Sequence, residues 1–365
     1  MIPVAKPSFS SLEKKYLMQA IDSGWISSKG KFIEEFEQKF ARKYGGFATT
    51  TSNGTTALHL ALVALGIGPG DEVIVPSFTF IASVNVVCHV GAKPVLVDIE
   101  KKTWNIDPAK IEAAITKRTK AIIVVHIYGQ PAQMGKILKI AKKHNLKIIE
   151  DCAEAQGAKA NNQYVGTIGD IGCFSFFGNK IMTSGEGGLC QTRSKKLHDL
   201  MTLYKNHGMD VKKRYSHPVV GFNFRMTNLQ AAVALGQLEQ VDSFIEKRDK
   251  IRAQYDKCLS DLFESKTIER MPNSGPDRSV CWFYSILTTL QDRDKLMAHL
   301  EKKGIETRPF FIPVHLQGAY KKLRHPKLSV SEEIGSRGIN LPTFVSLKDS
   351  EIKLICNEIH NYFKT

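Results

Sequence analysis

The feature that most constrains the fold is the alternation of short apolar runs with helical patterns over the first two-thirds of the chain. This order favours an α/β fold with a parallel or mixed sheet, because each strand is followed by a helix that can cross over to the next strand. We predict strands at residues 72–75, 94–99, 121–128, 146–150, 173–177 and 189–192, and helices at residues 54–65, 108–116, 134–144 and 195–205.

The last third of the chain is organised differently. A helical pattern runs from residue 227 to about residue 260 as one helix or two joined helices, and a polar stretch at 271–278 predicts a loop. The later segments predict a small α/β lobe: 282–288, 293–303 and 350–362. A chain of 365 residues can hold two cores. We therefore expect a large domain over residues 1–250 and a small one over 251–365, with residues 1–25 able to pack against the small domain.

Composition and charge exclude several classes of protein. The net charge of +15 comes from short, dispersed basic clusters without interleaved aromatic residues, so we expect no nucleic-acid partner. These charges belong to solvated helix faces or attract an anionic small substrate. No apolar run approaches the roughly 20 residues of a membrane span, and the start has no signal-peptide pattern, so we expect a cytoplasmic protein without a membrane partner. The seven scattered cysteines predict thiols and no metal site.

Residues 175–188 hold the side chains that suggest a chemical function. Lys180 lies on a loop of small residues, Ser175 is a hydroxyl five positions earlier, and Asp151 ends an upstream apolar strand. An amine for an imine bond, a donor for a phosphate and a carboxylate for a ring nitrogen are what a protein needs to bind pyridoxal phosphate. Lys180 is therefore the candidate catalytic residue.

A second phosphate-binding element is predicted at residues 51–58, where small and hydroxyl residues precede a helix. The first N–H groups of a helix and the positive end of its dipole attract anions. An ordinary helix cap is the alternative, but together with Ser175 the segment predicts a two-sided phosphate site. The sequence contains no G-x-G-x-x-G and no Walker A motif, so dinucleotide and ATP sites have no support.

Other residues near these segments have two interpretations each. Asp151 either pairs with a ring nitrogen or caps a helix. Glu154 and Gln156 follow it closely and could reach the phenolic oxygen of the same ring. Either Phe78 or Phe80 could stack on a planar cofactor, or both could fill the core.

Taken together, these motifs resemble the sugar aminotransferases of the DegT/DnrJ/EryC1/StrS family, which are vitamin B6 enzymes with the aspartate aminotransferase fold (fold type I). The resemblance extends along nearly the whole chain. It rests on residues 25–30, 52–55, 76–80, 126–129, 150–154, 169–172, 175–188, 221–228 and 308–311. It implies a large domain with a mostly parallel sheet and a smaller C-terminal α/β domain.

The resemblance also implies a role for each matching residue. Lys180 would bond to the cofactor and move protons. Asp151 would pair with the ring nitrogen, and Glu154, which is Gln in many relatives, would approach the ring hydroxyl. The remaining roles are stacking by Phe80, phosphate binding by Gly54, Thr55 and Ser175, a phosphate contact from the other subunit by Asn223 (with Asn228 as a second candidate), and a substrate wall of Trp25, Arg308 and His315.

The activity that the resemblance implies is transfer of an amino group from L-glutamate to C4 of a nucleotide-linked 4-keto-6-deoxy sugar, with pyridoxal 5'-phosphate as cofactor and a homodimer that shares its active sites. Residues 176–180, 307–315 and 337–342 are most similar to family members that use GDP-4-keto-6-deoxymannose. UDP- or dTDP-linked substrates remain the alternative. A sugar dehydratase of the same family is disfavoured, because relatives with that activity carry histidine in place of Lys180. A nicotinamide-dependent oxidoreductase and a non-catalytic regulator are the more distant alternatives.

Overall fold

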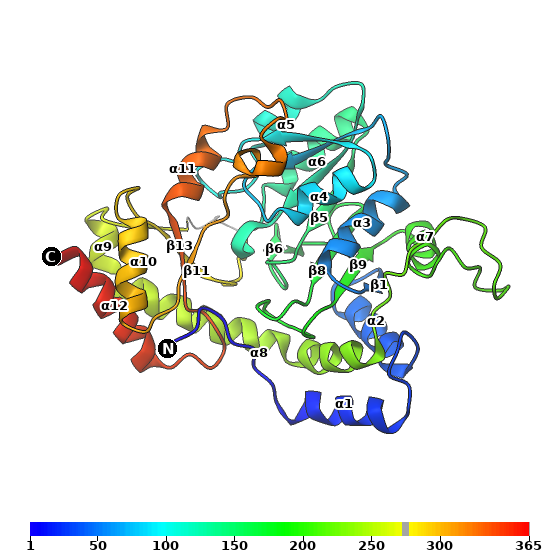
Figure 1. Ribbon diagram of the computed structural model, residues 1–365, viewed down its shortest axis with the longest axis horizontal. Helices are drawn as coiled ribbons and strands as arrows, with labels where there is room; N and C mark the ends of the chain where they lie inside the picture. The colour runs from blue at the N-terminus through cyan, green and yellow to red at the C-terminus, as the bar shows by residue number, and fades with distance from the viewer. Residues whose placement is uncertain (272–276, 365) are drawn as a thin grey trace.

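A seven-stranded sheet forms the centre of the larger part of the protein in the computed structural model, which describes residues 1–271 and 277–364 (Figure 1). Strand β9 runs antiparallel to both of its neighbours, and β8, β5, β4, β2 and β3 pair in parallel. In spatial order the strands are β1 (Phe47–Thr51), β9 (Gly188–Thr192), β8 (Ile171–Ser175), β5 (Lys147–Asp151), β4 (Thr119–Val125), β2 (Glu72–Pro76) and β3 (Lys93–Val97).

Helices connect and cover these strands. Their burial follows the apolar spacing: in α2, Phe32, Phe36, Phe40 and Tyr44 recur every four residues and are all buried. Helix α3 packs against β8 and β9, with α4 and α7 beside it. The helices of this part are α1 (Ser11–Asp22), α2 (Lys31–Tyr44), α3 (Gly54–Ala64), α4 (Ala82–His89), α5 (Pro108–Ala114), α6 (Met134–His144) and α7 (Lys195–Lys205).

A second sheet and a second cluster of buried apolar residues lie toward the C-terminus. The cluster begins with Ile251 and Tyr255, although Trp282, Phe283 and Phe310 pack into the first core. The elements of this part are the strands β10 (Glu269–Arg270), β11 (Tyr284–Leu287), β13 (Gly338–Leu341) and β12 (Arg308–Pro309), and the helices α9 (Ser260–Glu264), α10 (Arg293–Lys302), α11 (Ser329–Arg337) and α12 (Asp349–Lys364). A small hairpin, β6 (Lys159–Ala160) and β7 (Gln163–Tyr164), lies apart from both sheets. The domain boundary near residue 250 stays a prediction.

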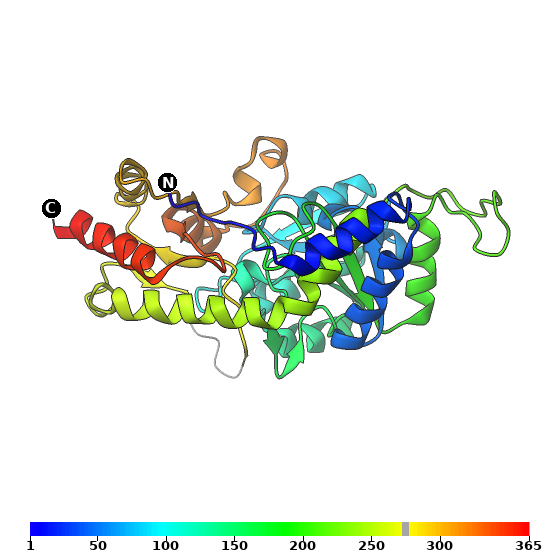
Figure 2. The same ribbon diagram turned by 90° about the horizontal axis from the view of Figure 1, so that it is seen from below.

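The long helix α8 (Asn228–Cys258) runs from the first core to the second, as both views show (Figures 1 and 2). Thr227 caps its start, with a reciprocal bond from Gln230. The N-terminal segment contacts both parts: Ile2 forms a bridge with Ile305, whereas α1 packs against α8. No helix within the described ranges combines the length and the apolar character that a membrane span requires.

Most predicted elements are confirmed, with shifts of a few residues at their ends. The strand predicted at 121–128 is wrong in its last part: β4 ends at Val125, and Tyr128 adopts a left-handed conformation (φ 49°) in a short turn. The helical pattern at 227–260 is one helix, α8, followed by the short α9. The predicted loop at 271–278 lies in part outside the described residues.

Candidate active site

A cavity of about 830 Å³ lies where three parallel strands end. Val125, Asp151 and Ser175 are the last residues of β4, β5 and β8, and all three line this cavity. Parallel strands bring their carboxyl ends to one edge of a sheet, where open α/β folds bind their ligands. The sheet topology therefore gathers residues that are far apart in the sequence.

Lys180 reaches the cavity from the loop between β8 and β9. The loop closes on itself through the Ser184 N–H and the Thr183 hydroxyl, which both donate to the carbonyl of Phe176 at 2.9 Å. The backbone N–H of Lys180 donates to the carbonyl of Phe177. At the end of the side chain, Nζ lies 4.0 Å from the centre of the Trp282 ring.

Burial and neighbouring charges shift the protonation of two side chains in the cavity. Burial lowers the pKa of Lys180, and the charge of Arg308 lowers it further, while Glu154 and Asp151 oppose the shift. Burial raises the pKa of Glu154 to about 7, although Lys180 and a hydrogen bond from the Tyr128 N–H act against this rise. The site thus brings together the Lys180 amine, which loses its proton at a lower pH than usual, and the Glu154 carboxyl, which loses its proton at a higher pH than usual.

Asp151 is buried and fixed by two donors. One carboxylate oxygen accepts from the Ser83 hydroxyl at 2.7 Å, and the other accepts from the Ala153 N–H at 3.1 Å. The second bond caps a turn, so part of the capping interpretation is also correct, although no helix follows. A carboxylate that is held on both oxygens at the edge of the cavity keeps one orientation.

Gly54, Thr55 and Ser175 meet at another wall of the cavity. The Asn53 side chain caps α3 by accepting from the Thr56 N–H, which leaves the earlier N–H groups of the helix available to a ligand. A Cβ at Gly54 would lie 2.7 Å from the Cβ of Ser175, so only glycine lets the helix start approach β8 this closely. The result is a small cradle of backbone N–H groups and a hydroxyl.

Aromatic side chains form the remaining walls. Phe80 lines the cavity and is 55% exposed, whereas Phe78 is 1% exposed and packs against Tyr128 and Phe310 in the core. Of these two candidates, Phe80 is therefore the one that a planar ligand could contact. Its ring centre lies 5.8 Å from that of Phe311, which also lines the cavity.

The predicted substrate residues are placed differently from one another. Arg308 lines the cavity, is exposed, and forms a loose ion pair with Glu306 at 3.6 Å. Trp25 is 57% exposed and does not line the cavity of its own chain. His315 is buried, and its Nδ1 lies 2.7 Å from the hydroxyl of Ser77, so its ring is engaged outside the cavity.

Three polar residues near the site are engaged elsewhere or point outward. Asn223 is exposed, and its side-chain oxygen accepts from Arg225 Nε. Asn228 is buried and bonds to the Phe32 N–H and to the carbonyl of Trp25, so it is held within its own chain. Gln156 donates to the carbonyl of Ser175 and accepts from the Met182 N–H, which holds the lysine loop rather than reaching the cavity.

The structure also shows residues that the sequence did not single out. Ser83 holds Asp151, Tyr128 holds Glu154 through its N–H, and Trp282 covers Lys180. The position of Ser83 just after the 76–80 motif was a usable signal. No local pattern marked Trp282, which comes from a segment about 100 positions after Lys180.

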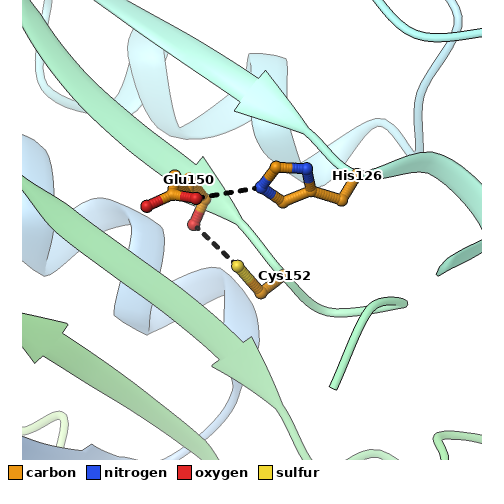
Figure 3. Close-up of side chains that lie close together, drawn as sticks. All are labelled: His126, Glu150 and Cys152. Carbon is orange, nitrogen blue, oxygen red and sulfur yellow. Dashed lines mark hydrogen bonds and ion pairs between the residues drawn. The ribbon is translucent and has the colours of Figure 1, made fainter. Parts of the chain in front are cut away.

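Among the described residues, one group of three potential metal ligands lies close together: His126, Glu150 and Cys152 (Figure 3). Its atoms already have partners. The Glu150 carboxylate accepts from His126 Nε2 and from three backbone N–H groups, and His126 Nδ1 accepts from the Ala132 N–H. Burial raises the pKa of the Cys152 thiol well above its usual range, which disfavours the thiolate that binds metals. This cluster fastens β4 and β5 beside the site, and the expectation of no metal stays a prediction.

The cavity fits the expected cofactor. It offers an amine, a fixed carboxylate, and a cradle of N–H and hydroxyl groups that a side chain at Gly54 would fill. These are the groups that would bond to the aldehyde, the ring nitrogen and the phosphate of pyridoxal phosphate.

Comparisons with known proteins agree with this geometry. The pattern of the DegT/DnrJ/EryC1/StrS aminotransferase family matches residues 7–360. The chain is 48% identical over 364 residues to a GDP-perosamine synthase of Escherichia coli O157:H7, covering 99% of this chain and 98% of that protein. It is also 48% identical over 357 residues to a GDP-perosamine synthase of Caulobacter vibrioides, covering 96% and 95%.

The fold is that of solved aminotransferases. The structure of an aminotransferase from Psychrobacter cryohalolentis superposes with a TM-score of 0.93 and 31% identity, covering 98% of each chain. Both the sequence and the fold therefore match over nearly their full length, and the predicted class of enzyme and its fold are confirmed. The chain belongs to the DegT/DnrJ/EryC1/StrS aminotransferase family and is a pyridoxal-phosphate-dependent aminotransferase.

Proposed function

We propose that the protein transfers the amino group of L-glutamate to C4 of GDP-4-keto-6-deoxymannose and so makes GDP-perosamine. The observation that carries the reaction type is the Lys180 amine, held in a cavity with Asp151 and Glu154. Support for the substrate comes from the 48% identity, over nearly the whole chain, to two GDP-perosamine synthases. An aminotransferase acting on a UDP- or dTDP-linked 4-keto-6-deoxy sugar is the competing outcome of the substrate test.

Bound pyridoxal phosphate supplies an electron-accepting ring that stabilises negative charge on the carbon bearing the amine. The residues of this chain would hold it and move protons. Gly54, Thr55 and Ser175 would bind the phosphate, and the fixed Asp151 carboxylate would bind the ring nitrogen. Because burial lowers the pKa of Lys180, its amine is available to accept a proton from one carbon and return it to another.

Glu154 would act beside the lysine. One of its oxygens is held by the Tyr128 N–H, which fixes the carboxyl at the cavity wall. With a pKa near 7, this group carries its proton for part of the time at neutral pH, so it can donate a hydrogen bond to a ring oxygen. Phe80 would pack on the ring face, because it is the accessible aromatic of its segment.

Arg308 is the residue of the site best suited to an anionic part of a substrate. Its guanidinium group is exposed at the cavity and its pairing with Glu306 is loose, so a carboxylate or phosphate could replace that partner. Either the glutamate carboxylate or the diphosphate of the nucleotide would satisfy it. A purely structural ion pair is the alternative for this residue.

The proposed assembly is a homodimer with shared active sites. The side-chain oxygen of Asn223 accepts from Arg225 Nε, and within the described residues the NH₂ group of Asn223 has no partner, so that group would be available to a second chain. The loop that follows α7 projects from the body of the protein (Figure 1) and exposes apolar side chains, among them Val220 at 92%. Exposed apolar groups in such a loop are typical of a contact surface. Trp25 would then belong to the site of the partner.

Mixing two inactive variants tests the shared site. A Lys180→Ala chain and an Asn223→Asp chain would form mixed dimers with one doubly altered site and one intact site. We expect activity to return on mixing, up to about a quarter of the wild-type value for random exchange. The control is each variant alone, and subunit exchange is verified with a mass tag. Full exchange without recovered activity would refute the shared site.

The substrate is tested with a coupled assay of glutamate consumption. Purified enzyme is given GDP-, UDP- and dTDP-linked 4-keto-6-deoxyhexoses in parallel, with the Lys180→Ala variant as the blank. We expect the highest kcat/KM for the GDP-linked mannose derivative. Equal or better turnover of a UDP or dTDP substrate would refute the GDP assignment while leaving the aminotransferase assignment intact.

Two broader expectations, the location of the protein and the use of its product, accompany the proposed reaction. The cytoplasmic location expected from the sequence remains a prediction. The product would be an activated amino sugar for a surface polysaccharide such as the O-antigen of lipopolysaccharide.

A further inference from the structure

Trp282 is an aromatic side chain that contacts the amine of Lys180. Its ring centre lies 4.0 Å from Lys180 Nζ, although the two residues are 102 positions apart in the sequence. An ammonium group over the face of an indole ring is attracted by the negative charge of that face. Trp282 also lines the cavity, so the contact lies inside the site and not in the core behind it.

Trp282 is held through both its ring and its backbone. Its Nε1–H donates to the carbonyl of Asn179, the residue directly before Lys180, at 2.7 Å. The backbone carbonyl of Trp282 accepts a hydrogen bond from Arg248 Nη1 at 2.8 Å. The ring of Tyr128 stacks on the indole ring, with 6.0 Å between ring centres and an angle of 20° between the planes. A ring held in this way keeps one orientation toward the loop that carries the lysine.

The buried cation that holds the backbone of Trp282 is energetically unfavourable, which argues that the position of Trp282 matters. Arg248 is buried, and it is bonded to backbone carbonyls of residues 281, 282 and 343 instead of to a carboxylate. Its Nε is left without a partner among the described residues. Burial of a cation without an opposite charge is unfavourable, and here the Arg248 side chain fixes the backbone of residues 281 and 282, just before β11.

We propose that Trp282 is a positioning residue for the catalytic lysine: its ring holds the Lys180 amine at the cavity wall during the stages in which that amine is not bonded to the cofactor. The inference rests on the proposed role of Lys180 as the reacting group. In this proposal the amine of Lys180 lies against the Trp282 ring whenever it is neither bonded to the cofactor nor transferring a proton. The ring also favours the ammonium form, and so offsets part of the effect of burial on this amine.

A purely structural role for Trp282 makes different predictions. In that case its loss would lower stability without a specific effect on the protonation of Lys180. Two substitutions separate the contributions. Trp282→Leu removes the ring and the N–H donor but leaves an apolar wall, while Trp282→Phe keeps an aromatic face, although a smaller one, and loses the bond to Asn179. Phe283→Leu is the matched control, because Phe283 also lines the cavity and packs on Trp282 without a contact to the lysine.

The test measures the pKa of Lys180 directly in protein stripped of its cofactor. Competitive labelling with isotopic acetic anhydride over a series of pH values, followed by peptide mass spectrometry, gives the pKa of each lysine, and the surface lysines serve as internal references. We expect Trp282→Leu to lower the pKa of Lys180 by about one unit, equal to about 1.4 kcal/mol of lost preference for the ammonium form. Trp282→Phe should show less than half of this shift, and Phe283→Leu almost none.

In the holoenzyme, Trp282→Leu should lower kcat about tenfold with little change in the KM for glutamate, and Trp282→Phe should restore most of the rate. Circular dichroism and thermal unfolding verify that each variant is folded. An unchanged or raised pKa of Lys180 in a folded Trp282→Leu variant would overturn the proposal. Full activity of Lys180→Ala would instead refute the proposed role of the lysine. The labelling experiment would still show whether Trp282 affects the pKa of Lys180, because it does not depend on activity.

Discussion

Replacing Gly54 by alanine should damage the proposed phosphate site while leaving the rest of the fold in place. The added Cβ would lie 2.7 Å from the Cβ and 3.1 Å from the hydroxyl oxygen of Ser175. Carbon atoms in contact are normally about 3.5–4.0 Å apart, so the start of α3 and the end of β8 must separate by roughly 1 Å. Both elements contribute to the cradle, and both would move.

The size of the effect follows from two opposing terms. Overpacking of a tight contact costs typically about 1–3 kcal/mol, and alanine stabilises a helix by at most about 1 kcal/mol relative to glycine. With the full helix gain the remainder is up to about 2 kcal/mol, which appears as lost stability or as weaker cofactor binding. If binding takes most of it, the affinity for pyridoxal phosphate falls by up to about thirtyfold.

The assay is a titration of stripped protein with pyridoxal phosphate, followed by absorbance, together with thermal unfolding of the stripped protein. Gly178→Ala is the matched control, because a Cβ at Gly178 meets nothing within 4 Å and the residue lies on the same loop as Lys180. We expect the control to bind like the wild type. Wild-type affinity and wild-type stability in Gly54→Ala, or an equal loss in the control, would refute the steric argument.

Three further predictions concern the charged groups of the site. Lys180→Ala should abolish transamination with an unchanged circular dichroism spectrum, because the substitution removes the amine and leaves the backbone in place. Turnover of this variant at the wild-type rate would contradict the proposed catalytic role of Lys180. Asp151→Asn should keep Ser83 and Ala153 as partners and retain the cofactor, but turnover should fall about a thousandfold, since a charge pair at about 4 Å in such a site is worth about 4 kcal/mol. Because burial raises the pKa of Glu154 from 4.5 to about 7, the folded stripped protein holds a proton that the unfolded chain has released between these pH values. Its free energy of unfolding should therefore fall as the pH rises through this window, and denaturant titrations should show a flatter pH dependence for Glu154→Gln.

The sequence predicted the parts of the site that carry local signals. Lys180 stands on a loop of small residues, and Asp151 and Ser175 end apolar strands, so their types and positions could be read from short segments. The parallel pairing of β5 with β8 then explains why these two strand ends meet. Expectations of this kind depend only on strand order along the chain and on the common edge of a parallel sheet.

The residues that the sequence did not predict come from distant segments or are engaged by the backbone. Trp282 reaches Lys180 only because the chain returns to the first core after α8, and no spacing rule records such a return. Conversely, Gln156 and His315 carry polar groups that could bind a cofactor or substrate, but these groups are engaged within the protein. Gln156 bonds to the backbone around the lysine loop, and His315 bonds to Ser77. A polar residue near a motif serves backbone amides and neighbouring hydroxyls as readily as a ligand.

The course of α8 has a consequence for engineering and for the evolution of such enzymes. The helix has 31 residues, about 46 Å of continuous rod, and its two halves serve different cores. Near the middle of its first half, Gln237 accepts from the Thr183 N–H in the lysine loop, while Ile251 and Tyr255 pack in the second cluster. A cut near residue 250 would leave one fragment with a severed helix end and the other with uncovered apolar side chains. The C-terminal part therefore cannot be exchanged between relatives as a unit at that position; a productive graft has to carry the whole helix, and with it the support of the loop that carries Lys180.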